Sequence, residues 1–122
     1  GILRPIIPVY FAIGDRKIQL DVLVDSGADL TILHAEIGEI LGINIESGEQ
    51  RNFTGITGVS KSAFRHSLDI IVGGYRFPTK VTFTYGLNQN IPPVVGQYGF
   101  FDLFVVKFDL LKEEVELKNR NQ

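Results

Sequence analysis

The carboxylate of Asp25 is the side chain in this sequence whose setting best suits chemistry. It opens the stretch Asp25-Ser26-Gly27-Ala28, which directly follows the apolar run Val22-Leu23-Val24. A buried strand that ends in a turn of small residues can present one acid at the surface, with Ser26 supplying a hydroxyl and Gly27 allowing close backbone approach. The pattern is typical of a carboxylate that acts as an acid or a base.

A second Asp-Ser-Gly or Asp-Thr-Gly triplet does not occur in the chain. Peptide hydrolysis without a metal or a covalent nucleophile uses two carboxylates that share one proton, one acting as base toward water and one as acid toward the carbonyl oxygen. Two such groups about 3 Å apart cannot both ionise. This chemistry would need two copies of the chain. The triplet alone is also ordinary turn chemistry, so its surroundings must support it.

Length and composition limit the other function classes. The chain of 122 residues carries a formal net charge of -2 and has no Cys, which fits one domain without disulfides, a thiol nucleophile or thiolate metal sites. Its scattered Lys and Arg residues argue against a nucleic-acid partner. Charges interrupt every apolar run before about 18 residues, so we expect no membrane span in the chain as given. Because it starts with Gly and lacks Met, a piece of a longer or membrane-anchored protein stays open, as does the compartment.

The residue pattern favours an all-β fold, because β-branched and aromatic residues cluster in short runs separated by Gly, Asn and Pro. Along 17–25, Ile18, Leu20, Val22 and Val24 alternate with less apolar residues, so Asp25 emerges on the less apolar face. Apolar spacing followed by Gly42 predicts a helix over 35–41. We further expect strands at 6–13, 30–33, 67–72, 76–84 and 94–96, a hairpin over 49–64, one or two helical turns over 98–104, a closing hairpin of 105–111 with 115–117, and a frayed polar tail over 118–122.

The other residues that could bind or react fit structural roles. His34 and His66 lack metal-ligand spacing, and His66 and Ser67 are neighbours on an expected strand, so their side chains point to opposite faces. Gly73-Gly74 joins two expected strands and opens no helix, which indicates a hairpin turn rather than a phosphate loop. We therefore expect no metal and no cofactor. The remaining aromatic cluster, predicted to be core, is Phe100, Phe101, Phe104 and Phe108.

With these surroundings, the sequence resembles the retropepsin-like aspartic proteases, which are single-lobed, homodimeric relatives of pepsin. The resemblance covers about 5–117 of the 122 residues and rests on three motifs in order. Residues 23–29 with Thr31 look like the catalytic loop, residues 55–58 look like the flap, and Val94-Val95-Gly96 looks like the second hydrophobic-hydrophobic-Gly motif.

The resemblance implies a closed, pepsin-like barrel with one or two short helices, formed by the whole chain 1–122 as a single domain. It implies a homodimer that cleaves an extended peptide or protein substrate, with Asp25 as the catalytic acid. Ser26 would bond across the dimer, Gly27 would contact the substrate backbone, and Gly96 would pack beneath the loop. The implied substrate-binding residues are Ser26, Gly27, Ala28, Asp29, Gly55, Ile56, Thr57 and Val95.

Two positions depart from the family pattern. Gln97 follows Gly96 where retroviral members commonly have Arg, the partner of the Asp four residues after the catalytic one. Asp29 therefore lacks its expected partner, and its role as an ion-pair member or as a binder of substrate amides stays open. Thr57 also interrupts the usual closely spaced glycines of the flap. A second interpretation remains, in which the fold serves as a non-catalytic peptide-binding or dimerisation module.

Overall fold

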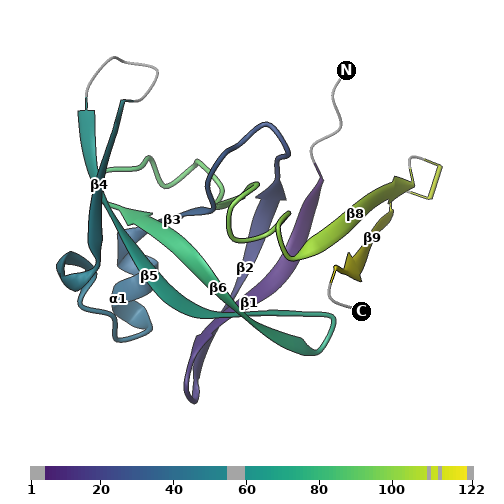
Figure 1. Cartoon of the computed structure of the whole chain (residues 1–122), viewed down its shortest axis with the longest axis horizontal. Helices are drawn as coiled ribbons and strands as arrows, with labels where there is room; N and C mark the ends of the chain where they lie inside the picture. The colour runs from purple at the N-terminus through teal and green to yellow at the C-terminus, as the bar shows by residue number, and fades with distance from the viewer. Residues whose placement is uncertain (1–4, 55–59, 110, 113, 121–122) are drawn as a thin grey trace.

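The structure is a computed structural model that describes residues 5–54, 60–109, 111–112 and 114–120. Strands dominate this part of the chain, which confirms the all-β class (Figure 1). In order along the chain, the elements are β1 (Ile6–Ile13), β2 (Arg16–Val24), β3 (Ile32–His34), α1 (Ala35–Ile40), the 3-10 helix η1 (Ile45–Ser47), β4 (Glu49–Thr54), β5 (Ser60–Val72), β6 (Tyr75–Thr84), β7 (Val94–Val95), β8 (Phe104–Asp109) and β9 (Glu114–Asn119).

The first seven strands form one sheet in the order β1-β2-β7-β3-β6-β5-β4. β1 also pairs with β5, so the strand pairings return to their starting point and form a ring. β7 is one of the strands of this ring and lies between β2, to which it is parallel, and β3, to which it is antiparallel. The segment after β2 and the segment after β7 therefore emerge side by side.

The core lies within this ring and draws apolar side chains from each of its strands. The alternation predicted for β2 is present, since Val22 and Val24 are buried while Asp21 is exposed. Buried aromatic rings from β1 and β6 fill the centre, with Phe11 and Phe83 both fully buried. Burying this apolar area is the main favourable contribution to folding.

The helix α1 is terminated as its sequence predicts, by Gly42, which directly follows the C-cap residue Leu41. Gly42 has a φ of 85°, a conformation that glycine adopts without steric cost. The Gly42 N–H donates to the carbonyl of Glu39 and the Ile43 N–H donates to that of Gly38, both at 2.9 Å. This paired arrangement is a Schellman motif, which satisfies the last carbonyls of the helix.

The two hairpins predicted over 49–64 and 67–84 share one continuous strand. β5 pairs with β4 over its first half and with β6 from Ala63 to Val72. The expected ranges left 65 and 66 between the two hairpins, but β5 runs through both residues, because Arg65 pairs with Glu49 of β4 and with Thr82 of β6, and His66 pairs with Val81 of β6.

Of the one or two helical turns predicted over 98–104, the structure has one, over 100–104, which the Phe104 N–H closes by donating to the Phe100 carbonyl at 3.1 Å. Gly99 has a φ of 101°, which breaks any right-handed helix at that point. The residues before this turn form a wider turn around Gly99, in which the Phe101 N–H donates to the Gly96 carbonyl at 3.0 Å. Phe100, Phe101 and Phe104 are buried, with the Phe100 ring against the other two, which confirms the core prediction for these residues. The side chain of Phe108, the fourth residue of that prediction, lies outside the described side chains.

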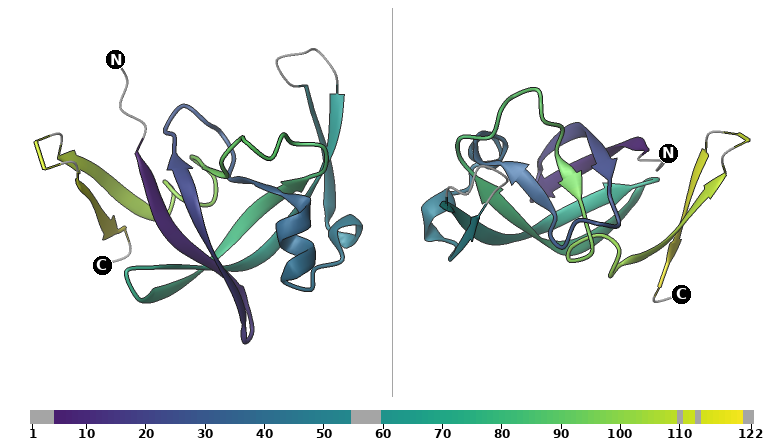
Figure 2. Two further views of the ribbon diagram at one scale, coloured as in Figure 1. Left: turned by 180° about the vertical axis from the view of Figure 1, so that it is seen from behind. Right: turned by 90° about the horizontal axis from the view of Figure 1, so that it is seen from above.

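The closing hairpin β8–β9 forms its own two-stranded sheet and projects from the body of the molecule (Figures 1 and 2). The frayed tail predicted from 118 onward was wrong up to residue 120. Lys118 and Asn119 belong to β9, and Arg120 donates its backbone N–H to Leu103 and its Nε to the carbonyl of Phe101 at 2.8 Å. In the described part of the chain, no helix is long and apolar enough to cross a membrane.

Candidate active site

Asp25 lies directly after β2, at the first position of a tight turn. The Ala28 N–H donates to the Asp25 carbonyl at 3.1 Å, which closes the turn. Inside the turn, the Gly27 N–H donates to Asp25 Oδ1 at 2.9 Å. A hydrogen bond to an ionised carboxylate is stronger than one between neutral groups. The turn therefore fixes the orientation of the half-buried Asp25 side chain.

The segment after β7 supports this turn from below. The Asp25 N–H donates to the Val95 carbonyl at 3.1 Å, and the Gln97 N–H donates to the Ala28 carbonyl at 2.8 Å. Gly96, between them, is buried, and a Cβ atom on it would lie 2.6 Å from the Ala28 oxygen. Only glycine fits this position, so the packing of Gly96 beneath the loop agrees with the sequence-based expectation.

Two side chains complete the support, and the sequence did not identify either contact. Thr31 is buried, and its Oγ1 accepts a hydrogen bond from the Gly96 N–H at 3.2 Å. Gln97 Nε2 donates to the carbonyl oxygen of Ser26 at 2.8 Å. In the sequence, Gln97 stood out only as a departure from the family pattern, because an amide at this position does not reveal its acceptor.

The expected substrate-binding residues differ in their exposure. Ser26, Gly27 and Asp29 are exposed and Ala28 is half-buried, so all four residues can be reached from solvent. The expectation for Val95 was wrong, because its side chain is fully buried in the core. Alternation along the strand turns the Val95 side chain inward and leaves its carbonyl to accept from Asp25.

The expected flap residues Gly55, Ile56 and Thr57 lie outside the described residues. The hairpin that carries them is described on both sides, as β4 up to Thr54 and as β5 from Ser60. These two strands pair in antiparallel register, with Thr54 opposite Ser60. In Figure 1 their ends rise on the same side of the molecule as the loop after β2.

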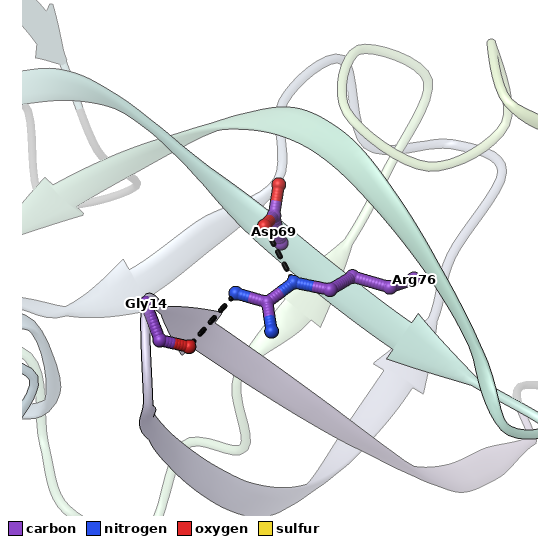
Figure 3. A network of polar contacts seen from close by, with 3 residues as sticks. All are labelled: Gly14, Asp69 and Arg76. Atoms are coloured by element: carbon purple, nitrogen blue, oxygen red, sulfur yellow. Dashed lines mark hydrogen bonds and ion pairs between the residues drawn. The ribbon is translucent and has the colours of Figure 1, made fainter.

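Charge pairs in the described structure lie outside the loop. The carboxylate of Asp29 makes no ion pair with any described residue. The pair between Arg76 Nε and Asp69 Oδ2, at 2.6 Å, belongs to the β5–β6 hairpin, and Arg76 also donates to the Gly14 carbonyl (Figure 3). This network joins β6 to the β1–β2 turn.

The described residues contain no group of three or more His, Asp or Glu side chains that could hold a metal ion. His66 instead bonds through Nε2 to the Ile45 carbonyl at 2.7 Å and packs edge-on against Phe83. His34 Nε2 lies 3.2 Å from the carbonyl oxygen of Asn88, within hydrogen-bonding distance. Both rings thus have structural partners.

Solved structures of retropepsin-like protease domains are similar to this chain. The retroviral protease-like domain of Ddi1 from Leishmania major has a TM-score of 0.70 at 16% identity, over 98% of this chain and 91% of that one. A retropepsin-like aspartic protease from Rickettsia conorii has a TM-score of 0.67 at 18% identity, over 94% and 89%. The EIAV protease in complex with an inhibitor has a TM-score of 0.53 at 24% identity, over 78% and 83%.

At these identities the similarity shows the fold. The chain has the fold of the retropepsin-like protease domains, as its sequence motifs predicted. No protein-family model and no curated protein matches the sequence.

Proposed function

We propose that this chain is an aspartic endopeptidase that cleaves extended peptide or protein substrates as a homodimer. The observation that carries the proposal is the setting of Asp25, whose carboxylate accepts the Gly27 N–H in a tight turn at the end of a core strand. The backbone of Gly96 packs directly against the turn, and this close packing fixes the position of the turn and of its carboxylate. The similarity to protease folds supports the same activity.

The two Asp25 side chains of the dimer would face each other across a twofold axis and share one proton. The ionised carboxylate takes a proton from water, whose oxygen attacks the scissile carbonyl carbon, while the protonated one donates to the carbonyl oxygen. The C–N bond of the tetrahedral intermediate then breaks, and the leaving nitrogen receives a proton from the pair. No metal or cofactor takes part in these steps.

An extended substrate would bind as an added strand between the loop and the β4–β5 hairpin. Main-chain hydrogen bonds supply affinity in this binding mode, and alternate side chains occupy pockets. Ser26 would bond across the dimer, and the exposed carboxylate of Asp29, free of an ion pair with any described residue, would accept a substrate N–H. The residues assigned to substrate binding are Ser26, Gly27, Ala28, Asp29, Gly55, Ile56 and Thr57.

The hairpin β8–β9 provides a surface for the second copy. Within the described residues these two strands form strand pairs only with each other. A lone two-stranded hairpin is marginally stable in water. Apolar residues of one face pack against the core, among them Val106 and Leu117.

The charge sequence of β9 is complementary to itself. Antiparallel pairing of two β9 strands about Leu117 would place Glu116 opposite Lys118 of the partner subunit, and Glu114 opposite Arg120 of the partner subunit, the residue that directly follows β9. The twofold axis repeats both pairs. Opposite charges that face each other across strands stabilise a sheet by about 0.2 to 1 kcal/mol each. β8 offers fewer facing charges, because antiparallel pairing of two β8 strands about Phe108 would place only Lys107 opposite Asp109 of the partner subunit.

Cleavage of a peptide library and sedimentation of the purified chain test the proposal together. The wild-type chain should sediment as a dimer and cleave at mildly acidic pH, and the Asp25→Asn variant should sediment as a dimer without cleaving. Cleavage by that variant would exclude the aspartic mechanism. Peptide binding without cleavage by the wild-type chain would instead establish the non-catalytic module.

A further inference from the structure

One peptide group connects Gln97 to the carboxylate of Asp25. Gln97 Nε2 donates to the Ser26 carbonyl oxygen at 2.8 Å, and the Gly27 N–H donates to Asp25 Oδ1 at 2.9 Å. The Ser26 carbonyl and the Gly27 N–H are the two ends of the same planar peptide bond. The side chain of Gln97 therefore hydrogen-bonds to the carbonyl of a planar peptide group, and the N–H of the same group hydrogen-bonds to Asp25.

Among the described residues, the Gln97 side chain and the Asp25 carboxylate are the groups that hydrogen-bond to this peptide group. Ser26 and Gly27 are both exposed, so water competes for their hydrogen bonds. A glycine next to the peptide group allows many backbone conformations, so the plane can rotate at small energetic cost. A rotation that turns the Ser26 carbonyl away would also turn the Gly27 N–H away from Asp25.

Gln97 is well anchored for this role. Its own N–H donates to the Ala28 carbonyl at 2.8 Å, and the preceding Gly96 is buried beneath the loop. The amide therefore reaches the Ser26 oxygen from a fixed backbone. Hydrogen bonds that share a polar group also strengthen one another, so a donor to the Ser26 carbonyl makes the Gly27 N–H a better donor.

We propose that Gln97 is a positioning residue for Asp25, which it orients through the Ser26–Gly27 peptide group without touching substrate. The inference rests on the proposed function and names the side chain that keeps its carboxylate in place. The Gly27 hydrogen bond favours the ionised carboxylate, so its loss makes ionisation harder. Loss of the Gln97 donor should then shift the acidic limb of the pH–rate profile to higher pH.

The other titratable or charged groups around the loop are few. Asp29 lies on the loop itself, and Tyr98 lies in the segment beneath it, with its ring 4.7 Å from the guanidinium of Arg65 on β5. In the proposed dimer, the partner's Asp25 also faces the site. Uncharged substitutions at position 97 leave all of these groups in place, so the shift reports on the hydrogen bond.

The test compares two variants that differ in their ability to donate. Gln97→Met keeps the length of the side chain and removes the donor, and we expect kcat to fall about three- to tenfold with little change in KM, since one hydrogen bond is lost. Its acidic limb should move up by about half a pH unit or more. Gln97→Lys keeps a donor and should retain wild-type kcat within about twofold, without an upward shift. Gln19→Met, an exposed site on β2, controls for the added thioether.

NMR of the same proteins separates this inference from the proposed function. In Gln97→Met the Gly27 amide proton should move upfield, and the titration midpoint of the Asp25 carboxyl carbon should rise relative to wild type. These shifts in a chain without peptidase activity would support the positioning role while refuting the proposed function. An unchanged Gly27 resonance and midpoint, or a Gln97→Lys variant as impaired as Gln97→Met, would overturn the inference even in an active enzyme.

Discussion

Gly96 lies so close beneath Leu30 that a Cβ atom on it would be 2.5 Å from the Leu30 carbonyl oxygen. The opposing atoms are backbone, which cannot move aside as the end of a flexible side chain can. Gly96 is also buried, and its N–H is held by Thr31 Oγ1. The position of the loop from Asp25 to Leu30 relative to β7 thus depends on Gly96, which has no side chain.

Gly96→Ala should therefore destabilise the protein and lower any peptidase activity. We expect a loss of about 1 to 3 kcal/mol in the free energy of unfolding, because the added methyl group overpacks a tight site. Urea denaturation measures this loss, and kcat/KM of the folded fraction measures the displacement of Asp25.

Gly73→Ala is the matched comparison. Gly73 has a φ of 58°, and no atom lies within 4 Å of the place that a methyl group on it would take, so the substitution there introduces backbone strain without crowding. It should cost about 1 kcal/mol and leave kcat/KM of the folded protein unchanged. Equal effects of the two substitutions on activity would contradict the role of Gly96 as the floor of the loop.

The pH dependence of activity should be bell-shaped with an acidic maximum. At low pH both Asp25 carboxyls of the dimer are protonated and no base remains, and at high pH both are ionised and no acid remains. Measurement of kcat/KM from about pH 3 to about pH 9 checks this. An optimum above about pH 8 would argue against a shared proton.

Local patterns predicted the parts of the fold that depend on neighbouring residues. The alternation through Val22 and Val24 correctly gave β2, and Gly42 correctly gave the end of α1, because side-chain periodicity and positive φ act within a few residues. The turn at Asp25 followed from its small residues in the same way.

Other features depend on contacts between distant segments and were missed. β5 continues through Arg65 and His66 because β6 pairs with both residues and β4 also pairs with Arg65. Val95 looked like a cleft residue, yet its place inside the ring of strands buries its side chain. The hydrogen bond from Gln97 to Ser26 joins residues 71 positions apart in the sequence, and a local residue pattern cannot predict such a contact.

Charge reversal on β9 should separate and then recombine the subunits. Lys118→Glu places a carboxylate opposite Glu116 of the partner subunit, twice in each dimer, and Glu116→Lys creates the corresponding pairs of facing ammonium groups. Each variant alone should dimerise about tenfold or more weakly than wild type, since attraction becomes repulsion at two cross-strand positions. An equimolar mixture should regain wild-type dimerisation, because every facing pair is again opposite in charge.

Sedimentation equilibrium of each variant and of the mixture measures this effect. Lys112→Glu makes the same charge change in the turn of the hairpin, outside β9, and should leave the dimer unchanged. Equal weakening by Lys112→Glu would point to net charge rather than to strand pairing. Undiminished dimerisation of Lys118→Glu would exclude the β9 register.

The same charge-steered mixture can place a single Asp25 in each dimer. Lys118→Glu chains mixed with Glu116→Lys chains that also carry Asp25→Asn should form dimers with one carboxylate and one amide at the site. If the two carboxylates share a proton and divide the roles of acid and base, kcat should fall by at least about 100-fold relative to the same mixture with both Asp25 residues intact. If each chain instead carried an independent site, the mixture would keep about half of its activity, because half of its sites would be unaltered. Retention of about half of kcat, with dimerisation confirmed by sedimentation, would therefore refute the two-carboxylate mechanism while leaving the dimer in place.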